Sequence, residues 1–146
     1  MMLTYHHILV GLDGSDLAEH AFSEALEIAK RNNAELVVAQ IIPDTLYTNA
    51  RMTYPTETTA SEKHFVQSYL DQKVQFAKEH GVYNVRAILK VGAPRRELAF
   101  TIPEEAHIDL TVLGVSGKGA FERLLIGSVA QFISVHSSTN VLLVKP

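Results

Sequence analysis

The chain has 146 residues, 47% of them hydrophobic and 20% charged, which is the size and balance of one folded domain and excludes disordered and fibrous proteins. Its 13 basic and 16 acidic residues leave a formal charge of -3, which argues against nucleic acid or an anionic membrane as a partner. There is no cysteine, which excludes disulfides, thiolate metal sites and cysteine nucleophiles.

The first elements predict a crossover between two parallel strands. Residues 8–12 form a short apolar run of branched side chains that stops at turn formers and helix caps. Apolar residues then recur at steps of three and four along 18–29, which predicts a helix that ends at Asn32 and Asn33. A second apolar run at 35–42 gives the order strand, helix, strand. We therefore expect a parallel sheet.

The middle of the chain predicts a surface segment, a long helix and a third strand. Residues 44–60 are rich in Thr, Pro, Tyr and Asn and show no period. A helix is predicted over 61–80, with Gly81 as its stop, and a strand over 85–91. The residues of this helix expected to point inward are Val66, Tyr69, Leu70, Phe76 and Ala77.

The last third predicts three more elements around a glycine-rich loop. A helix begins near Pro94, and Pro103 is expected to divide it into two short pieces. A strand at 108–113 precedes the glycine-rich loop of 114–127, which leads to a helix at 128–136 and a terminal strand at 141–144. With no linker or repeat, we expect a single α/β domain over residues 1–146, built on a doubly wound parallel sheet.

Ligands of open parallel sheets bind beyond the carboxyl ends of the strands, which draws attention to the loop after the first strand. Its glycine permits a tight turn, and the N-terminus of the next helix offers N–H groups to an anion. Taken alone, Asp13 fits a turn or cap residue as well as a ligand contact. The candidate binding residues of this loop are Gly11, Leu12, Asp13, Gly14 and Ser15.

The loop of 114–127 carries the spacing G-x2-G-x9-G-S immediately before a helix. Gly114 and Gly117 permit a close approach of the backbone to a ligand, and the helix start at 127–129 presents free N–H groups that favour phosphates. Lys118 and Arg123 can add positive charge, although a solvated surface position accounts for either one. The candidate binding residues are Gly114, Val115, Gly117, Lys118, Gly119, Gly127, Ser128 and Val129.

With these patterns the chain resembles the universal stress protein family along essentially its whole length. The segments 8–15, 109–114 and 127–130 match the family's pattern in order, and G-x2-G-x9-G-S/T marks the family's ATP-binding members. The resemblance implies an adenine nucleotide alpha hydrolase-like fold with a five-stranded parallel sheet in the order 3-2-1-4-5. It also implies ATP, ADP or AMP as the ligand, with Mg²⁺ on the phosphates.

The resemblance further implies a place for each part of the nucleotide. Asp13 would lie near the ribose or the metal-bound phosphates, which makes it the candidate magnesium ligand. Ile41 would border the adenine, Gly114 and Gly117 would line the path of ribose and phosphates, and 127–129 would hold the phosphates. The family resemblance also implies a homodimer that pairs the terminal strands, whose apolar edge needs a cover.

The resemblance implies a stress-response regulator with at most slow ATP hydrolysis. The sequence supports this independently, because only Asp13 and Glu122 are placed to activate a water near the loop. Two alternatives stay open: an adenylating enzyme of the same superfold, and an interaction module that binds no nucleotide. A P-loop is absent, and the seven histidines have no spacing typical of a metal site. Without a signal-like start or a run of about 20 apolar residues, a cytoplasmic location is expected.

Overall fold

Five apolar segments form one parallel sheet in the computed structural model, which describes residues 3–44, 56–117 and 125–146, with 56–59 as backbone only. The sheet order is β3-β2-β1-β4-β5 and every neighbouring pair is parallel, which confirms the predicted α/β class and strand order. The strands are β1 His7–Leu12, β2 Glu35–Pro43, β3 Val85–Gly92, β4 Leu110–Gly114 and β5 Asn140–Val144.

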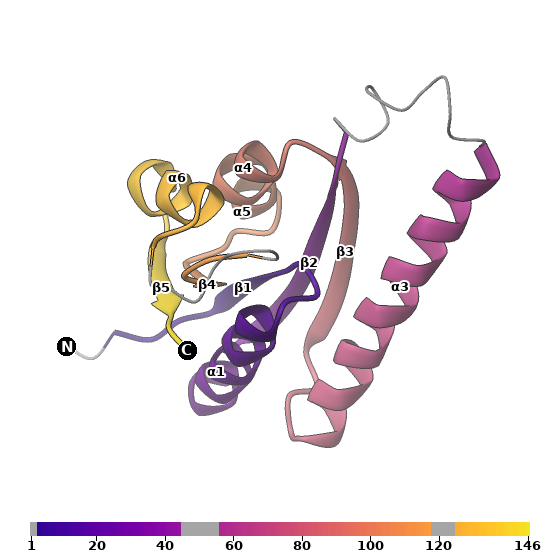
Figure 1. Cartoon of the computed structure of the whole chain (residues 1–146). Coiled ribbons are helices and arrows are strands. Elements are labelled where there is room, and N and C mark those ends of the chain that lie inside the picture. Colours follow the sequence, from indigo (N-terminus) through magenta and orange to yellow (C-terminus); the bar gives the residue numbers. More distant parts are fainter. Residues whose placement is uncertain (1–2, 45–55, 118–124) are drawn as a thin grey trace.

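Helices cover both faces of this sheet. In Figure 1, α1 and α3 lie on one side of the strands, and α4, α5 and α6 lie together on the other side. This is the doubly wound arrangement that the sequence predicts. The helices are α1 Asp16–Asn32, α3 Thr56–Glu79, α4 Pro94–Arg96, the π-helix η1 Glu97–Thr101, α5 Ile102–Glu105 and α6 Ser128–His136.

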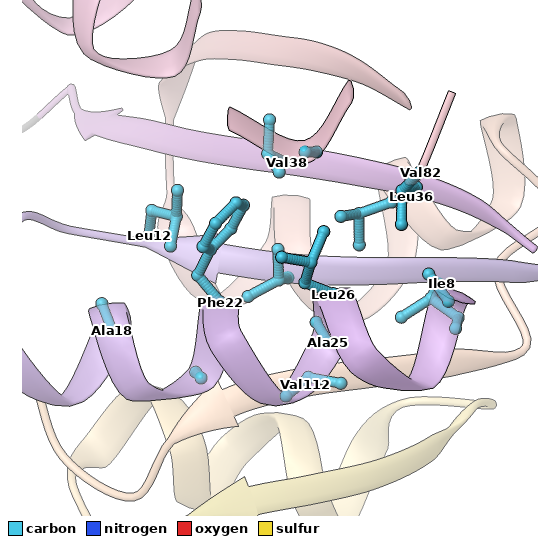
Figure 2. Packing of buried hydrophobic residues seen from close by; sticks show 14 of the residues in the cluster. Ile8, Leu12, Ala18, Phe22, Ala25, Leu26, Leu36, Val38, Val82 and Val112 are labelled. Atoms are coloured by element: carbon cyan, nitrogen blue, oxygen red, sulfur yellow. The ribbon is translucent and has the colours of Figure 1, made fainter. Parts of the chain in front are cut away.

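The side chains on the two faces of β1 belong to two separate hydrophobic clusters. Because side chains alternate along a strand, Ile8, Val10 and Leu12 pack toward α1, whereas Leu9 belongs to the cluster under η1, α5 and α6. Figure 2 shows the first cluster, with Phe22 of α1 reaching toward the strands beside Leu12. Central strands buried on both faces read as continuous apolar runs, as the sequence of β1 does.

The predicted helix ends are confirmed by backbone geometry. Asn33 has a φ of 51°, and its N–H donates to carbonyls of the last turn of α1. Gly81, just after α3, has a φ of 94°. Both residues stand in the left-handed region that commonly ends a helix.

Two details of the predicted long helix are wrong. The helix begins at Thr56, five residues before the predicted start at 61. Phe76 does not point into the core: its side chain is 44% exposed and stacks on His80 at 3.9 Å between ring centroids. The ring also meets the edge of Phe22 at 6.0 Å, so it lies at the rim of the α1–α3 contact, which a periodic pattern cannot tell from its centre.

The helix around Pro103 is not divided into two pieces as predicted. Residues 94–105 follow one continuous helical path, widened into a π-turn in which the N–H of Ile102 donates to the carbonyl of Glu97. A proline has no N–H to donate, and in an α-helix its ring would strike the carbonyl four residues earlier. The wider turn just before Pro103 provides the room that this ring needs.

The two edge strands differ in character. Arg86 of β3 pairs with Glu35 at 3.3 Å, and Lys90 of β3 pairs with Glu105 at 3.0 Å. The hydrogen bond that Lys90 donates to Glu105 raises the pKa of Lys90. At the opposite edge, the apolar residues 141–144 of β5 are only half-buried. No helix in the described ranges is long and apolar enough to cross a membrane.

Candidate functional site

The carboxyl ends of β1 and β4 lie side by side where the chain passes from one face of the sheet to the other. Val10 of β1 pairs with Val112 of β4. β1 is followed by α1 on one face, and β4 leads to α6 on the opposite face (Figure 1). Such a divergence is where open parallel sheets bind ligands. The predicted loops, 13–15 and 115–117, both border this place.

Asp13 is held by the turn that it forms. Its Oδ1 accepts a hydrogen bond from the backbone N–H of Ser15 at 2.9 Å. Gly14, between them, has a φ of 84°, which glycine adopts without strain. The hydroxyl of Ser15 accepts from the N–H of Ala18 at 3.1 Å and caps α1. Turn and cap roles are therefore present at this loop, whatever ligand it takes.

The start of α6 is tied to the end of β4 by backbone hydrogen bonds. The N–H of Gly127 donates to the carbonyl of Val115 at 2.8 Å, and the N–H of Val115 donates to the carbonyl of Val144 at 2.9 Å. Gly127 is the N-cap of α6 and makes no side-chain cap bond. The first helical hydrogen bond, from Gln131 to Gly127, leaves the N–H groups of residues 128–130 without a partner inside the helix.

The space beside two of the motif glycines is occupied by the protein itself. A Cβ on Gly114 would lie 3.0 Å from the Cβ of Leu17 in α1, and a Cβ on Gly127 would lie 3.2 Å from the Cα of Ser116. Both distances are shorter than the optimum of about 3.5 Å or more between carbon atoms. These glycines therefore let β4 approach α1, and let α6 begin directly against the loop of 115–117.

Gly117 differs, because its missing side chain faces a charged group. A Cβ on Gly117 would lie 2.8 Å from Oδ2 of Asp13. The two predicted loops therefore meet at Asp13 and Gly117, which lie 104 positions apart in the sequence and are brought together by the parallel pairing of β1 with β4. Predicted positions Lys118 and Gly119 lie outside the described residues.

Three other predicted residues offer a ligand little more than backbone. A Cβ on Gly11 would lie 2.8 Å from Cδ2 of Leu113, so this glycine is needed for packing under η1. Leu12 is 5% exposed and faces α1, while Ile41 is 8% exposed and belongs to the cluster on the α6 side. Among the residues of the last loop, Ser128 is exposed and Val129 half-buried.

A polar cluster between α1 and α3 extends from this site, and the sequence analysis missed it. Tyr69 and Lys73 of α3 both donate hydrogen bonds to Glu19 of α1. Burial and the hydrogen bond to Glu19 raise the pKa of Tyr69, and the negative charge of Asp13 adds to this effect. The four-residue spacing of Tyr69 and Lys73 on one helix face was the available signal.

The arrangement suits an anion better than a metal ion held by protein alone. Within 3–44, 56–117 and 125–146, no three His, Asp or Glu side chains gather closely enough to hold a metal. Helix N-terminal N–H groups bind phosphates, and Mg²⁺ commonly keeps several waters while it bridges phosphates to one carboxylate. The N–H groups of residues 128–130 and the carboxylate of Asp13 are the groups that would hold a phosphate with such an ion.

Known proteins are similar to this chain in sequence and in fold. Residues 4–145 match the universal stress protein family. A Staphylococcus aureus (strain USA300) chain that carries the family's name is 35% identical over 144 residues, which cover 99% of this chain and 86% of the other. The solved UspA from Lactobacillus plantarum is 26% identical with a TM-score of 0.84, covering 98% of this chain and 99% of that one. A universal stress protein solved in complex with cAMP is 27% identical with a TM-score of 0.74, covering 98% of each chain.

Proposed function

This chain belongs to the universal stress protein family, and from this premise we propose that it binds an adenine nucleotide, with ATP as the principal ligand, at the carboxyl ends of β1 and β4. The observation that carries the proposal is the start of α6, which opens on a glycine N-cap without a side-chain bond and adjoins both predicted loops. The solved relative that holds cAMP supports an adenine nucleotide as the class of ligand.

The proposed roles follow from the chemistry of each group. The N–H groups of Ser128 and Val129, with the hydroxyl of Ser128, bind the phosphates. The carboxylate of Asp13 accepts from a ribose hydroxyl or reaches Mg²⁺ on the phosphates. Gly114, Val115 and Gly117, whose backbone ends β4 and starts the next loop, line the sugar and phosphate path, with Lys118 and Gly119 continuing it. Ile41 borders the base, while Gly11, Leu12 and Gly14 shape the wall.

A proline at residue 128 tests the phosphate role of α6 with little effect on the helix. Proline removes the N–H of residue 128, yet it is favoured at the first helical position. Gly127, with φ -64° and ψ 156°, already has the extended backbone that a residue before proline needs. Ser128→Ala, which removes the hydroxyl but keeps the N–H, is the matched control.

We expect Ser128→Pro to bind ATP at least about tenfold more weakly than Ser128→Ala, because a hydrogen bond to a charged group contributes roughly 1.5 to 3 kcal/mol. Titration calorimetry with ATP, ADP, AMP and cAMP measures the affinities, and thermal unfolding checks that both variants stay folded. Equal ATP affinities of the two variants would show that the N–H of residue 128 at the start of α6 does not bind the phosphates. If no adenine nucleotide raised the melting temperature of the unmodified protein, the interaction-module alternative would be favoured instead.

Hydrolysis of the bound ATP is proposed to be slow at most. Asp13, the carboxylate that borders both loops within the described residues, already accepts the N–H of Ser15, whereas general-base catalysis needs a group aimed at a water. Release of phosphate from magnesium-ATP measures the rate. A turnover near about 10 per second, typical of enzymes, would instead favour an enzyme of the same superfold.

We also propose that two copies pair through β5 in a homodimer. β5 contacts a neighbour only on its β4 side within the described sheet, and its apolar side chains are half-buried. Leu143→Lys should then yield monomers in sedimentation velocity at micromolar concentration, whereas Tyr83→Lys, which changes an exposed residue beyond α3, should not. Monomers for the unmodified protein would end this proposal.

Finally, the proposed setting is the cytoplasm, where a nucleotide-dependent regulator of the stress response has its ligand at hand. The cysteine-free sequence is compatible with a reducing compartment. Fractionation of cells that express the tagged protein tests the location. Recovery with the membrane or the medium would contradict it.

A further inference from the structure

The contact between Asp13 and Gly117 can be isolated from the rest of the site. Oδ2 of Asp13 is the one described atom, outside the chain neighbours of Gly117, that a Cβ at this glycine would meet within 4 Å. The φ of Gly117 is not among the positive ones, which belong to Gly14 and Gly81 among the described glycines. Gly117→Ala therefore introduces no backbone strain, and the contact through which it would act on the described structure is the one with Asp13.

The carboxylate of Asp13 cannot simply turn away from an added methyl group. Its other oxygen accepts the N–H of Ser15 at 2.9 Å, and Ser15 caps α1. The opposite loop is also fixed, because Val115 is hydrogen-bonded both to Val144 and to Gly127. A methyl group at 117 would thus break the Asp13–Ser15 hydrogen bond or displace the start of a loop that is held at two points.

We propose that Gly117 is a positioning residue, whose missing side chain sets where the Asp13 carboxylate stands and thereby its contact with the nucleotide. The inference rests on the proposed nucleotide binding. It gives this glycine a role different from that of Gly127, whose missing side chain faces backbone alone. A ribose hydroxyl and a phosphate-bound Mg²⁺ are both partners for a carboxylate, and the experiment separates them.

A double-mutant cycle between the two positions tests the proposal. The four proteins are the unmodified chain, Gly117→Ala, Asp13→Ala and the double variant, each titrated with ATP in Mg²⁺ and in EDTA. We expect Gly117→Ala to weaken ATP binding about tenfold when Asp13 is present and less than about twofold when residue 13 is alanine. A loss seen in both buffers indicates the ribose hydroxyl, and a loss confined to Mg²⁺ indicates the metal.

Gly92→Ala is the matched control. Its Cβ would lie 3.3 Å from Oε1 of Glu97, so it also brings a methyl group to a carboxylate, but at the end of β3. This variant should bind ATP like the unmodified protein. An equal loss of affinity from Gly117→Ala with and without Asp13 would overturn the positioning role, because residue 117 would then act on the ligand directly.

The same cycle without nucleotide keeps the two proposals distinguishable. Gly117→Ala should lower the melting temperature when Asp13 is present, and the loss should largely disappear in the double variant. Additive melting shifts would overturn the contact even if ATP binds. If the unmodified protein bound no nucleotide, the proposed function and the nucleotide role of Gly117 would both fall, while coupled melting shifts would still show that Gly117 places Asp13.

Discussion

Replacement of Gly127 by alanine probes whether the start of α6 must stand where it does. The new Cβ would lie 3.2 Å from the Cα of Ser116, 3.6 Å from the N of Gly117 and 3.6 Å from the carbonyl oxygen of Val115. All three atoms are backbone, so no rotamer change relieves the contact. The helix start and the loop of 115–117 have to separate by a few tenths of an ångström.

The size of the effect follows from this geometry. Overpacking in a well-packed region destabilises by about 1 to 3 kcal/mol, and a separation this small belongs at the lower end, about 1 kcal/mol. For a chain of this length that is a fall of roughly 2 to 4 °C in melting temperature. ATP should bind about tenfold more weakly, because charge-assisted hydrogen bonds to the phosphates lose their geometry as the helix start moves.

Urea unfolding and calorimetric titration of the same preparations measure both quantities. Two results would refute the reasoning in different ways. If stability fell while ATP affinity stayed unchanged, the first turn of α6 would not hold the phosphates. If the free energy of unfolding stayed within about 0.5 kcal/mol of the unmodified value, the backbone contact of Gly127 would not be tight.

Three further predictions concern stability. The carboxylate of Asp109 accepts the backbone N–H groups of His6 and His7, at 2.8 and 3.0 Å, where β1 begins. Asp109→Ala should therefore lower the free energy of unfolding in urea by about 1 to 2 kcal/mol. An unchanged free energy would show that these hydrogen bonds do not stabilise the start of β1. Burial and the hydrogen bond to Glu19 raise the pKa of Tyr69 above the ordinary 10.0, so the neutral side chain contributes its full stability below about pH 10 and loses it as the pH rises further. Tyr69→Phe should therefore flatten the fall of the free energy of unfolding at alkaline pH. Parallel plots of stability against pH for the two proteins would contradict this. Gly11→Ala should destabilise the fold by about 1 to 3 kcal/mol, because the new Cβ would lie 2.8 Å from Cδ2 of Leu113. Adding Leu113→Val to this variant should restore part of the lost stability. Additive losses of the two substitutions in urea unfolding would show that Leu113 is not the obstacle.

The order of strands and helices could be predicted because buried parallel strands and amphipathic helices leave different patterns in the sequence. The run at 8–12 became β1, and Asn33 and Gly81 ended helices in the left-handed conformation. The strand order came from the family resemblance. It was confirmed by the pairing of β1 with both β2 and β4.

The misses in the fold have local physical causes. Pro103 predicts a broken helix because an α-helix cannot take a proline in its interior, but a π-turn can precede it, and no pattern of residues announces such a turn. Phe76 shares the helical period of buried residues, yet it lies at the edge of the covered strip. Its exposure depends on how far α1 and α3 overlap, which is a property of their packing.

The two loops of the candidate site could be named from the sequence, but the packing contacts of their glycines could not be. The spacing indicated that Gly117 and Gly127 belong to one loop system and suggested that they admit a ligand. The structure adds that Asp13 and backbone of 115–117 lie where a side chain at these two positions would stand. Such contacts join residues far apart in the chain, and they depend on strand register and loop path. The sequence alone does not contain these in readable form.

The two edges of the sheet limit how many copies can assemble. Strand β3 presents Arg86 and Lys90, whose ion pairs with acidic side chains make that rim a poor template for another strand. Strand β5 presents an apolar rim instead. If two copies pair through β5 about a twofold axis, both β5 edges are buried in the contact. The edges left at the two ends of the combined sheet are then the charged β3 strands. Assembly then stops at the dimer, because the apolar edge permits pairing and the charged edges disfavour the addition of further copies.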